Sequence, residues 1–256
     1  MINSSYIRQN VEKNVCTITI DRREKHNAFN EVIIAELKMI LKKIDTDANI
    51  QVVIINAEGK NFSAGADLDW MKRMARCSRE ANEADALTLG NLFQQLDRLS
   101  KPTIALVHGY VIGGGIGFVA CCDIAIATIE TQFCFSEVKL GLVPAIIAPY
   151  IIRSIGYGPA RRYFLTAELF SAIEAKEMGL LHQVVKVNAL QSIGYILAES
   201  IKKNGPQALL ATKRLLNDLL PINENIISQT ATFLSTIRTS NEARERINDF
   251  LKARKQ

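Results

Sequence analysis

Three short loops of this 256-residue chain combine small residues, glycines and a carboxylate in patterns that suit chemistry. The first loop spans residues 61–68, with the sequence NFSAGADL, and it follows a predicted strand. Its small side chains let a ligand approach the main chain, and N–H groups at a helix start can face an anionic atom. A tight strand-to-helix turn has the same composition, so this loop alone does not define a site.

The second loop is the glycine cluster GGGIG at residues 113–117, which lies between a predicted strand and a predicted helix. Glycines at this point permit close approach of a ligand to the backbone. A dinucleotide site is the rival interpretation, but the spacing differs from the G-x-G-x-x-G fingerprint. The cluster therefore indicates a backbone contact without naming the ligand.

The third loop is FSEVKLGLVP at residues 135–144, in which Glu137 stands among apolar residues just after a predicted strand. Desolvation raises the pKa of a carboxyl group in such surroundings, which suits a general acid/base. The alternative is an exposed Glu137 that pairs with Lys139. The histidines lack metal-ligand spacing and no G-x-S-x-G motif occurs, so neither a metal site nor a serine nucleophile is predicted.

Strand-like and helical patterns alternate over roughly the first 185 residues, which predicts an α/β domain with largely parallel strands. Later residues carry only helical periodicity. The predicted strands are 7–9, 15–20, 52–56, 103–107, 124–127 and 133–135, and the predicted helices are 28–44, one from 68, 83–99, 190–203, 206–219, 222–239 and 241–253.

Composition narrows the class of protein further. A hydrophobic content of 48% supports a sizeable core, and a net charge of +5 spread along the chain does not form a nucleic-acid-binding stripe. Five cysteines without a C-x-x-C motif indicate reduced thiols and a cytoplasmic protein. No secretory signal is predicted at the start. Residues 102–122 lack charge, but glycines and Pro102 interrupt them, so a strand-loop-helix unit is predicted rather than a membrane span.

In order and separation, the loops resemble those of the crotonase (enoyl-CoA hydratase/isomerase) superfamily. Residues 61–68 are similar to its first oxyanion loop, residues 108–117 to its second, and residues 136–144 to its catalytic-glutamate segment. Residues 23–29, REKHNAF, are similar to its coenzyme A-side loop. The resemblance covers essentially the whole chain and implies a crotonase-like ββα spiral core with a helical C-terminal region.

The resemblance also implies roles for individual residues. The N–H groups of Ala66 and Gly114 would hold the thioester oxygen as charge collects on it, each donor contributing roughly 3 kcal/mol to transition-state stabilisation. Glu137 would act as the acid/base. Coenzyme A, as part of the substrate and with no further cofactor, would be held by Lys25, Ala64, Asp67, Leu68 and Phe250, the last from a neighbouring subunit's tail.

One departure leaves two enzyme activities open. Family hydratases commonly use a second glutamate, and its position here is Gly117. A hydratase would then rely on Glu137 alone or on another carboxylate such as Asp69, whereas a Δ3,Δ2-enoyl-CoA isomerase needs only one base. Residues 65–75, 136–156 and 160–168 are most similar to the methylglutaconyl-CoA hydratase branch of leucine breakdown, and this finer similarity favours hydration. A substrate carboxylate would then meet a cation, with Lys72, Arg73 and Arg153 as the candidates.

The remaining expectations concern organisation and partners. Residues 1–188 are predicted to form the core, and residues 189–256 a helical region for trimerisation and a lid. The resemblance implies a homotrimer or a dimer of trimers, and the residue pattern predicts no membrane association. RNA binding is the alternative of another class, suggested by a pI near 8.9 and an RNA-binding member in the related branch. No RNP or KH motif supports it.

Overall fold

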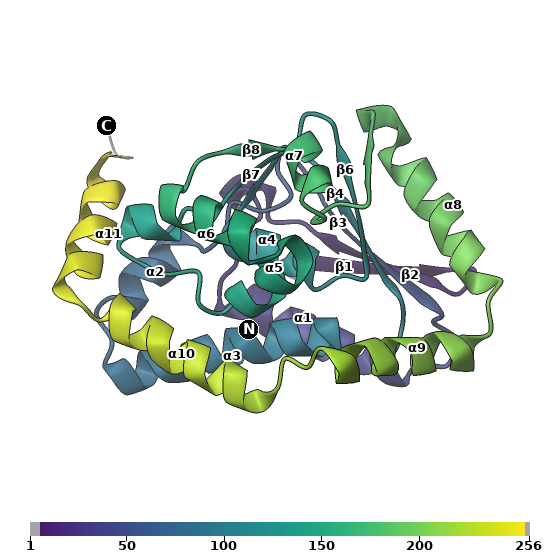
Figure 1. Cartoon of the computed structure of the whole chain (residues 1–256), viewed down its shortest axis with the longest axis horizontal. Helices are drawn as coiled ribbons and strands as arrows, with labels where there is room; N and C mark the ends of the chain where they lie inside the picture. The colour runs from purple at the N-terminus through teal and green to yellow at the C-terminus, as the bar shows by residue number, and fades with distance from the viewer. Residues whose placement is uncertain (1–5, 254–256) are drawn as a thin grey trace.

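A six-stranded sheet forms the centre of the structure, a computed structural model that describes residues 6–253 (Figure 1). Its strands follow the order β1–β2–β3–β4–β6–β9. All neighbours in this sheet are parallel except β1 and β2, which are antiparallel, so the prediction of largely parallel strands is confirmed. The strands are β1 (Ile7–Glu12), β2 (Val15–Ile20), β3 (Val52–Ala57), β4 (Thr103–Val107), β6 (Ile124–Thr128) and β9 (Gln183–Val185).

A second, three-stranded sheet alternates with the first along the chain. It consists of β5 (Tyr110–Ile112), β7 (Gln132–Cys134) and β8 (Phe170–Ser171). β4 in the large sheet leads to β5 in the small one, and β6 leads to β7 in the same way. The helix α4 (Gly114–Ala120) follows β5. These strand–strand–helix units confirm the predicted spiral core, and residues 102–122 form one such unit.

Alternate residues of the central strands face two separate helical layers, as the period of a strand requires. Val53 and Ile55 contact the core formed with α1 (Glu31–Thr46) and α3 (Arg79–Asp97). Val52 and Ile54 contact a second core that includes Leu190 of α8 (Leu190–Lys202). The sheet is therefore buried on both faces, which explains why its strands are almost continuously apolar.

The C-terminal helices wrap around this core (Figure 1). α10 (Glu224–Arg238) packs on α3, and α11 (Asn241–Ala253) packs on α2 (Leu68–Met74). A Cβ at Gly90 of α3 would lie 2.9 Å from Cγ2 of Ile227, so this glycine allows α10 its close approach. The other helices are η1 (Arg23–Lys25), η2 (Glu137–Leu140), α5 (Ala148–Ile155), α6 (Tyr157–Thr166), α7 (Ala172–Glu177), η3 (Val187–Ala189) and α9 (Pro206–Leu219).

Two predicted helices begin at other residues than expected, because a side chain caps the N-terminus of each helix. The helix expected at 28–44 begins at Glu31, because Asn30 accepts a hydrogen bond from the N–H of Ile33 at 3.0 Å. The helix expected at 83–99 begins at Arg79, because the Ser78 hydroxyl caps this helix by accepting a hydrogen bond from the N–H of Ala81. The division at residues 188 and 189 stays a prediction. In residues 6–253, no helix is long and apolar enough to cross a membrane.

Candidate active site

Backbone hydrogen bonds join the two glycine-bearing loops. The N–H of Ile112 donates to the carbonyl of Ser63 at 2.9 Å, and the N–H of Ser63 donates to the carbonyl of Tyr110 at 3.3 Å. A Cβ at Gly115 would lie 2.9 Å from Cβ of Ser63, so glycine is needed for this approach. The pairing fixes the position of one loop relative to the other.

Each of the two loops has one backbone N–H group without an acceptor among the described residues, on Ala66 and on Gly114. Phe29 accepts a hydrogen bond from Asp67 and donates one to Gly65, both at 2.7 Å, so it binds the backbone on either side of Ala66. Gly114 is the first residue of α4, where an N–H has no partner within its helix. Within residues 6–253, neither the N–H of Ala66 nor that of Gly114 donates a hydrogen bond.

Glu137 opens η2 and faces the glycine loop. A Cβ at Gly113 would lie 2.8 Å from Oε1 of Glu137, so the carboxylate packs against bare backbone. Its Oε2 is buried and has no hydrogen-bond partner in the described part of the chain. Burial raises the pKa of this carboxyl from 4.5 to about 7. The predicted acid/base chemistry therefore has a physical basis, and Lys139 is exposed instead of paired with Glu137.

A cavity of about 620 Å³ is lined by the residues that the sequence predicts for catalysis and for coenzyme A binding. A narrower cavity of about 90 Å³ also touches Ala66, Gly114 and Glu137 and continues among apolar side chains. The structure thus brings the three predicted catalytic groups to the junction of a wide cavity and a small one. The predicted residues that line the wide cavity are Lys25, Ala64, Ala66, Asp67, Leu68, Gly114, Glu137 and Phe250.

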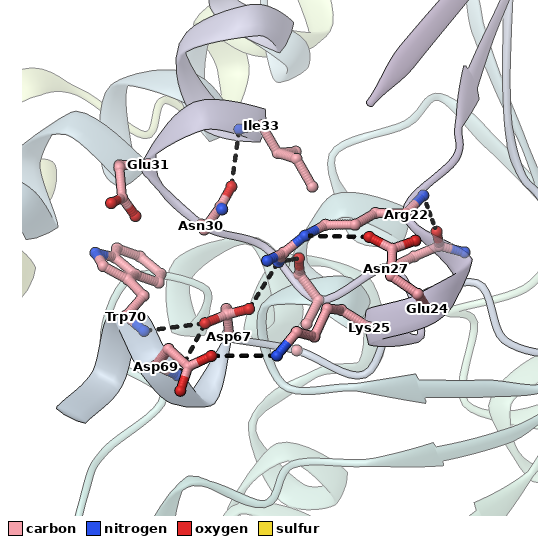
Figure 2. A network of polar contacts seen from close by, with 12 residues as sticks. Arg22, Glu24, Lys25, Asn27, Asn30, Glu31, Ile33, Asp67, Asp69 and Trp70 are labelled. Atoms are coloured by element: carbon pink, nitrogen blue, oxygen red, sulfur yellow. Dashed lines mark hydrogen bonds and ion pairs between the residues drawn. The ribbon is translucent and has the colours of Figure 1, made fainter. Parts of the chain in front are cut away.

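A buried ion pair holds the loop at residues 61–68, and Figure 2 shows it. Arg22 Nη1 lies 2.7 Å from Oδ2 of Asp67 and donates to the carbonyl of Ala28 at 3.0 Å. Oδ1 of Asp67 accepts from the N–H groups of Asp69 and Trp70, which caps α2. The Asp67 side chain, predicted to contact coenzyme A, is therefore occupied in the fold. Sequence reasoning missed Arg22, whose partner lies 45 residues away.

Asp69 does not supply the missing second carboxylate. Its Oδ2 lies 3.1 Å from Nζ of Lys25, and its side chain is 70% exposed (Figure 2). It lines neither the wide nor the narrow cavity. Lys25 does line the wide cavity, so this surface ion pair lies beside the predicted coenzyme A site.

Gly117 faces packed apolar side chains and lines neither cavity. A Cβ at this position would clash with Cγ2 of Ile147 and lie 3.4 Å from Cζ of Phe93. Both neighbours are almost fully buried. The space that a second glutamate would need is therefore filled with hydrocarbon.

The cations proposed to meet a substrate carboxylate lie elsewhere. Arg73 pairs with Glu31 and Arg153 pairs with Asp97, and none of Lys72, Arg73 and Arg153 lines either cavity. Arg238 of α10 lines the narrow cavity instead. Nothing near Arg238 in the sequence marks it, because the cavity forms only when α10 packs on α3.

Phe250 lines the wide cavity from the chain's own α11, whereas the family resemblance implies that a neighbouring subunit supplies this residue. Ala243 and Ile247 anchor α11 against Ala75, Leu140 and Leu142. The helix therefore packs against α2 and η2, which both line the wide cavity. Within residues 6–253, no cluster of three His, Cys, Asp or Glu side chains is arranged to hold a metal ion.

Comparison with known proteins agrees with this geometry. A sequence model described as enoyl-CoA hydratase/isomerase matches residues 10–256, and the chain belongs to this family. A putative enoyl-CoA hydratase of Thermus thermophilus is 30% identical, with 95% of this chain and 97% of that protein covered. A short-chain-enoyl-CoA hydratase of Clostridium acetobutylicum is 33% identical over 80% of this chain and 78% of its own length.

A solved structure shows the same architecture. The crystal structure of an enoyl-CoA hydratase from Shewanella pealeana matches with a TM-score of 0.82 and 40% identity. The match covers 97% of this chain and 94% of that one. The fold predicted from the resemblance is thereby confirmed, helical C-terminal region included.

Proposed function

We propose that the chain is an enoyl-CoA hydratase that adds water across the 2,3 double bond of an acyl-CoA thioester. The observation that carries the proposal is the meeting of two unpartnered N–H groups, on Ala66 and Gly114, with the buried carboxyl of Glu137. Backbone donors fixed in advance stabilise charge that develops on a thioester oxygen. The names of similar proteins favour hydration.

Glu137 suffices for both proton transfers. Its carboxylate takes a proton from water while the water oxygen bonds to C3, and the electrons of the double bond move onto the thioester oxygen. Ala66 and Gly114 hold this enolate through their N–H groups. Glu137 then returns its proton to C2, so one water molecule is added and the carboxylate is restored. A pKa of about 7 suits a group that both accepts and donates a proton near neutrality.

Isomerisation is the second candidate reaction. The packing of Ile147 against Gly117 favours it. Ile147 fills the space beside Gly117, and among the described residues Glu137 is the single carboxylate that lines the narrow cavity. Moving a double bond from C3 to C2 needs one base to carry a proton from C2 to C4. The two reactions therefore share the oxyanion donors and Glu137, and they differ only in whether water enters.

The two cavities suggest where the coenzyme A portion and the acyl group of the substrate bind. The wide cavity beside Lys25, Ala64, Leu68 and Phe250 suits the coenzyme A portion, and the narrow one suits a short acyl group. Asp67 would contribute its backbone there, since its side chain is bound to Arg22. Among short acyl groups, 3-methylglutaconyl is the finer candidate, on the sequence similarity given above.

Product masses separate the candidates. The protein is incubated with 2-enoyl-CoA, 3-enoyl-CoA and 3-methylglutaconyl-CoA, and the products are resolved by chromatography and weighed. Hydration adds the mass of one water molecule, whereas isomerisation leaves the mass unchanged and alters retention. Turnover of 3-enoyl-CoA alone, without a mass change, would replace the hydratase proposal with the isomerase. Absence of any turnover would reject both.

A homotrimer, or a dimer of trimers, is part of the proposal. The end of α9 presents Leu215, Leu216 and Leu219, each more than half exposed, next to the equally exposed Leu220. Apolar surface of this kind is commonly covered by another protein chain. Light scattering on the purified protein measures the assembly, and a monomer would contradict it. A cytoplasmic location stays a prediction.

A further inference from the structure

The narrow cavity is apolar at most points but carries a charge at each of two places. Glu137 is one, and Arg238, the last residue of α10, is the other. Residues such as Val143 and Ile146 line the space alongside them. A guanidinium beside a hydrocarbon chain loses hydration without compensation. The cavity is thus better matched to an acyl group that carries a polar atom.

Arg238 is only partly paired. Its Nη1 donates to Oδ2 of Asp85 at 2.8 Å and lies 3.5 Å from Oδ1 of Asn82. Its Nε and Nη2 donate to no group in residues 6–253, although the side chain is only 12% exposed. Arg238 also lines a cavity of about 40 Å³ that touches Ala66. Donors of the guanidinium thus remain for an acceptor that enters from the active site.

Neighbouring helices hold the guanidinium in place. Trp70 of α2 donates from Nε1 to Oδ1 of Asp85 at 3.1 Å, and its ring centroid lies 6.0 Å from Cζ of Arg238. Burial raises the pKa of the Asp85 carboxyl, although Arg238 and Trp70 act in the opposite direction. Three helices therefore fix Arg238, and fixed donors bind a ligand with a smaller loss of entropy.

Building on the proposed function, we propose that Arg238 selects short acyl groups that carry a distal carboxylate, so that the substrate is the coenzyme A thioester of a short unsaturated dicarboxylic acid. A guanidinium binds a carboxylate through two parallel hydrogen bonds, which a hydroxyl or a methyl group cannot reproduce. The narrow cavity limits the chain between thioester and carboxylate to a few carbons. Arg238 takes the role that the sequence suggested for Lys72, Arg73 or Arg153.

Calorimetric binding of two saturated thioesters tests this assignment. Glutaryl-CoA and pentanoyl-CoA have equally long acyl chains and differ in a terminal carboxylate against a methyl group. The wild-type protein is expected to bind glutaryl-CoA more tightly. In Arg238→Gln the affinity ratio should fall roughly 10- to 100-fold, the value of a charge-assisted hydrogen bond. No glutaryl-CoA preference in the wild type, or an unchanged ratio in Arg238→Gln, overturns the proposal.

Three further variants test whether Arg238 binds the ligand or only stabilises the fold. Arg238→Lys keeps the charge and should retain part of the preference, and Asp85→Asn removes the competing carboxylate and should increase it. Arg153→Gln breaks a comparable Arg–Asp pair outside both cavities and should leave the ratio unchanged. A ratio that falls in Asp85→Asn contradicts the assignment. Because neither ligand can be hydrated, this result is independent of whether the protein proves to be a hydratase.

Discussion

Gly117 packs against Ile147 so closely that a Cβ at position 117 would lie 2.9 Å from Cβ of Ile147. The relationship has a chemical consequence, since a second carboxylate at this position cannot be accommodated without displacing the buried Ile147. It joins α4 to the segment before α5 through hydrocarbon contact. The proposed catalysis therefore depends on Glu137 and the backbone donors alone.

Gly117→Ala is expected to destabilise the protein by about 1–3 kcal/mol, the usual cost of overpacking a core. The double variant Gly117→Ala, Ile147→Ala should lose less stability than the sum of the two single variants, because the truncated side chain gives the new methyl group room. Urea unfolding of all three measures the coupling. Gly158→Ala is the control, since a Cβ there meets nothing within 4 Å. Additive losses would contradict the contact.

The pH dependence of turnover should report Glu137. Burial raises the pKa of its carboxyl to about 7, and the reaction begins with the deprotonated form. We therefore expect kcat/KM to rise about tenfold per pH unit below 7 and to level off above it. Initial rates between pH 5 and 9 check this, with pH stability confirmed separately. A profile that levels off near pH 4.5 would mean that Glu137 is not buried as described.

The same pKa makes Glu137 a cost to stability. Its carboxyl has a pKa of about 7 when folded against 4.5 as the reference value, so ionisation opposes folding as pH rises from 4.5 to 7. Glu137→Gln removes this penalty, which amounts to about 3 kcal/mol above pH 7 and vanishes below pH 4.5. Unfolding free energies of both proteins at pH 5 and pH 8 test the difference. An equal effect at both pH values would contradict it.

The fold was largely predictable, because the strands VCTITI, VVIINA and TIALV are rich in apolar and β-branched residues, as buried parallel strands are. The site was predictable where motifs are local, as at Ala66, Gly114 and Glu137. Arg22 and Arg238 escaped prediction because their partners, Asp67 and Asp85, come from distant segments brought together by folding. The elements α5 to α7 also escaped, since short helices carry little periodicity.

The ion pair of Arg22 with Asp67 is expected to control both stability and rate. Its side chains are 9% and 4% exposed, so Arg22→Gln leaves a buried carboxylate without its cation, at about 3–5 kcal/mol. The loop that presents the Ala66 N–H should then move, lowering kcat. Arg8→Gln is the matched control, because the exposed Arg8–Glu58 pair contributes at most about 1 kcal/mol. Equal losses in the two variants would contradict the positioning role.

The central claim is that one buried glutamate performs the chemistry in a backbone oxyanion hole, and Glu137→Gln tests it most directly. Wild type and variant are incubated with a short 2-enoyl-CoA, the product is weighed, and butyryl-CoA binding is measured alongside. The wild type should yield product heavier by one water molecule. The variant should lose at least about 100-fold in kcat while still binding butyryl-CoA. Undiminished hydration by Glu137→Gln would contradict the account.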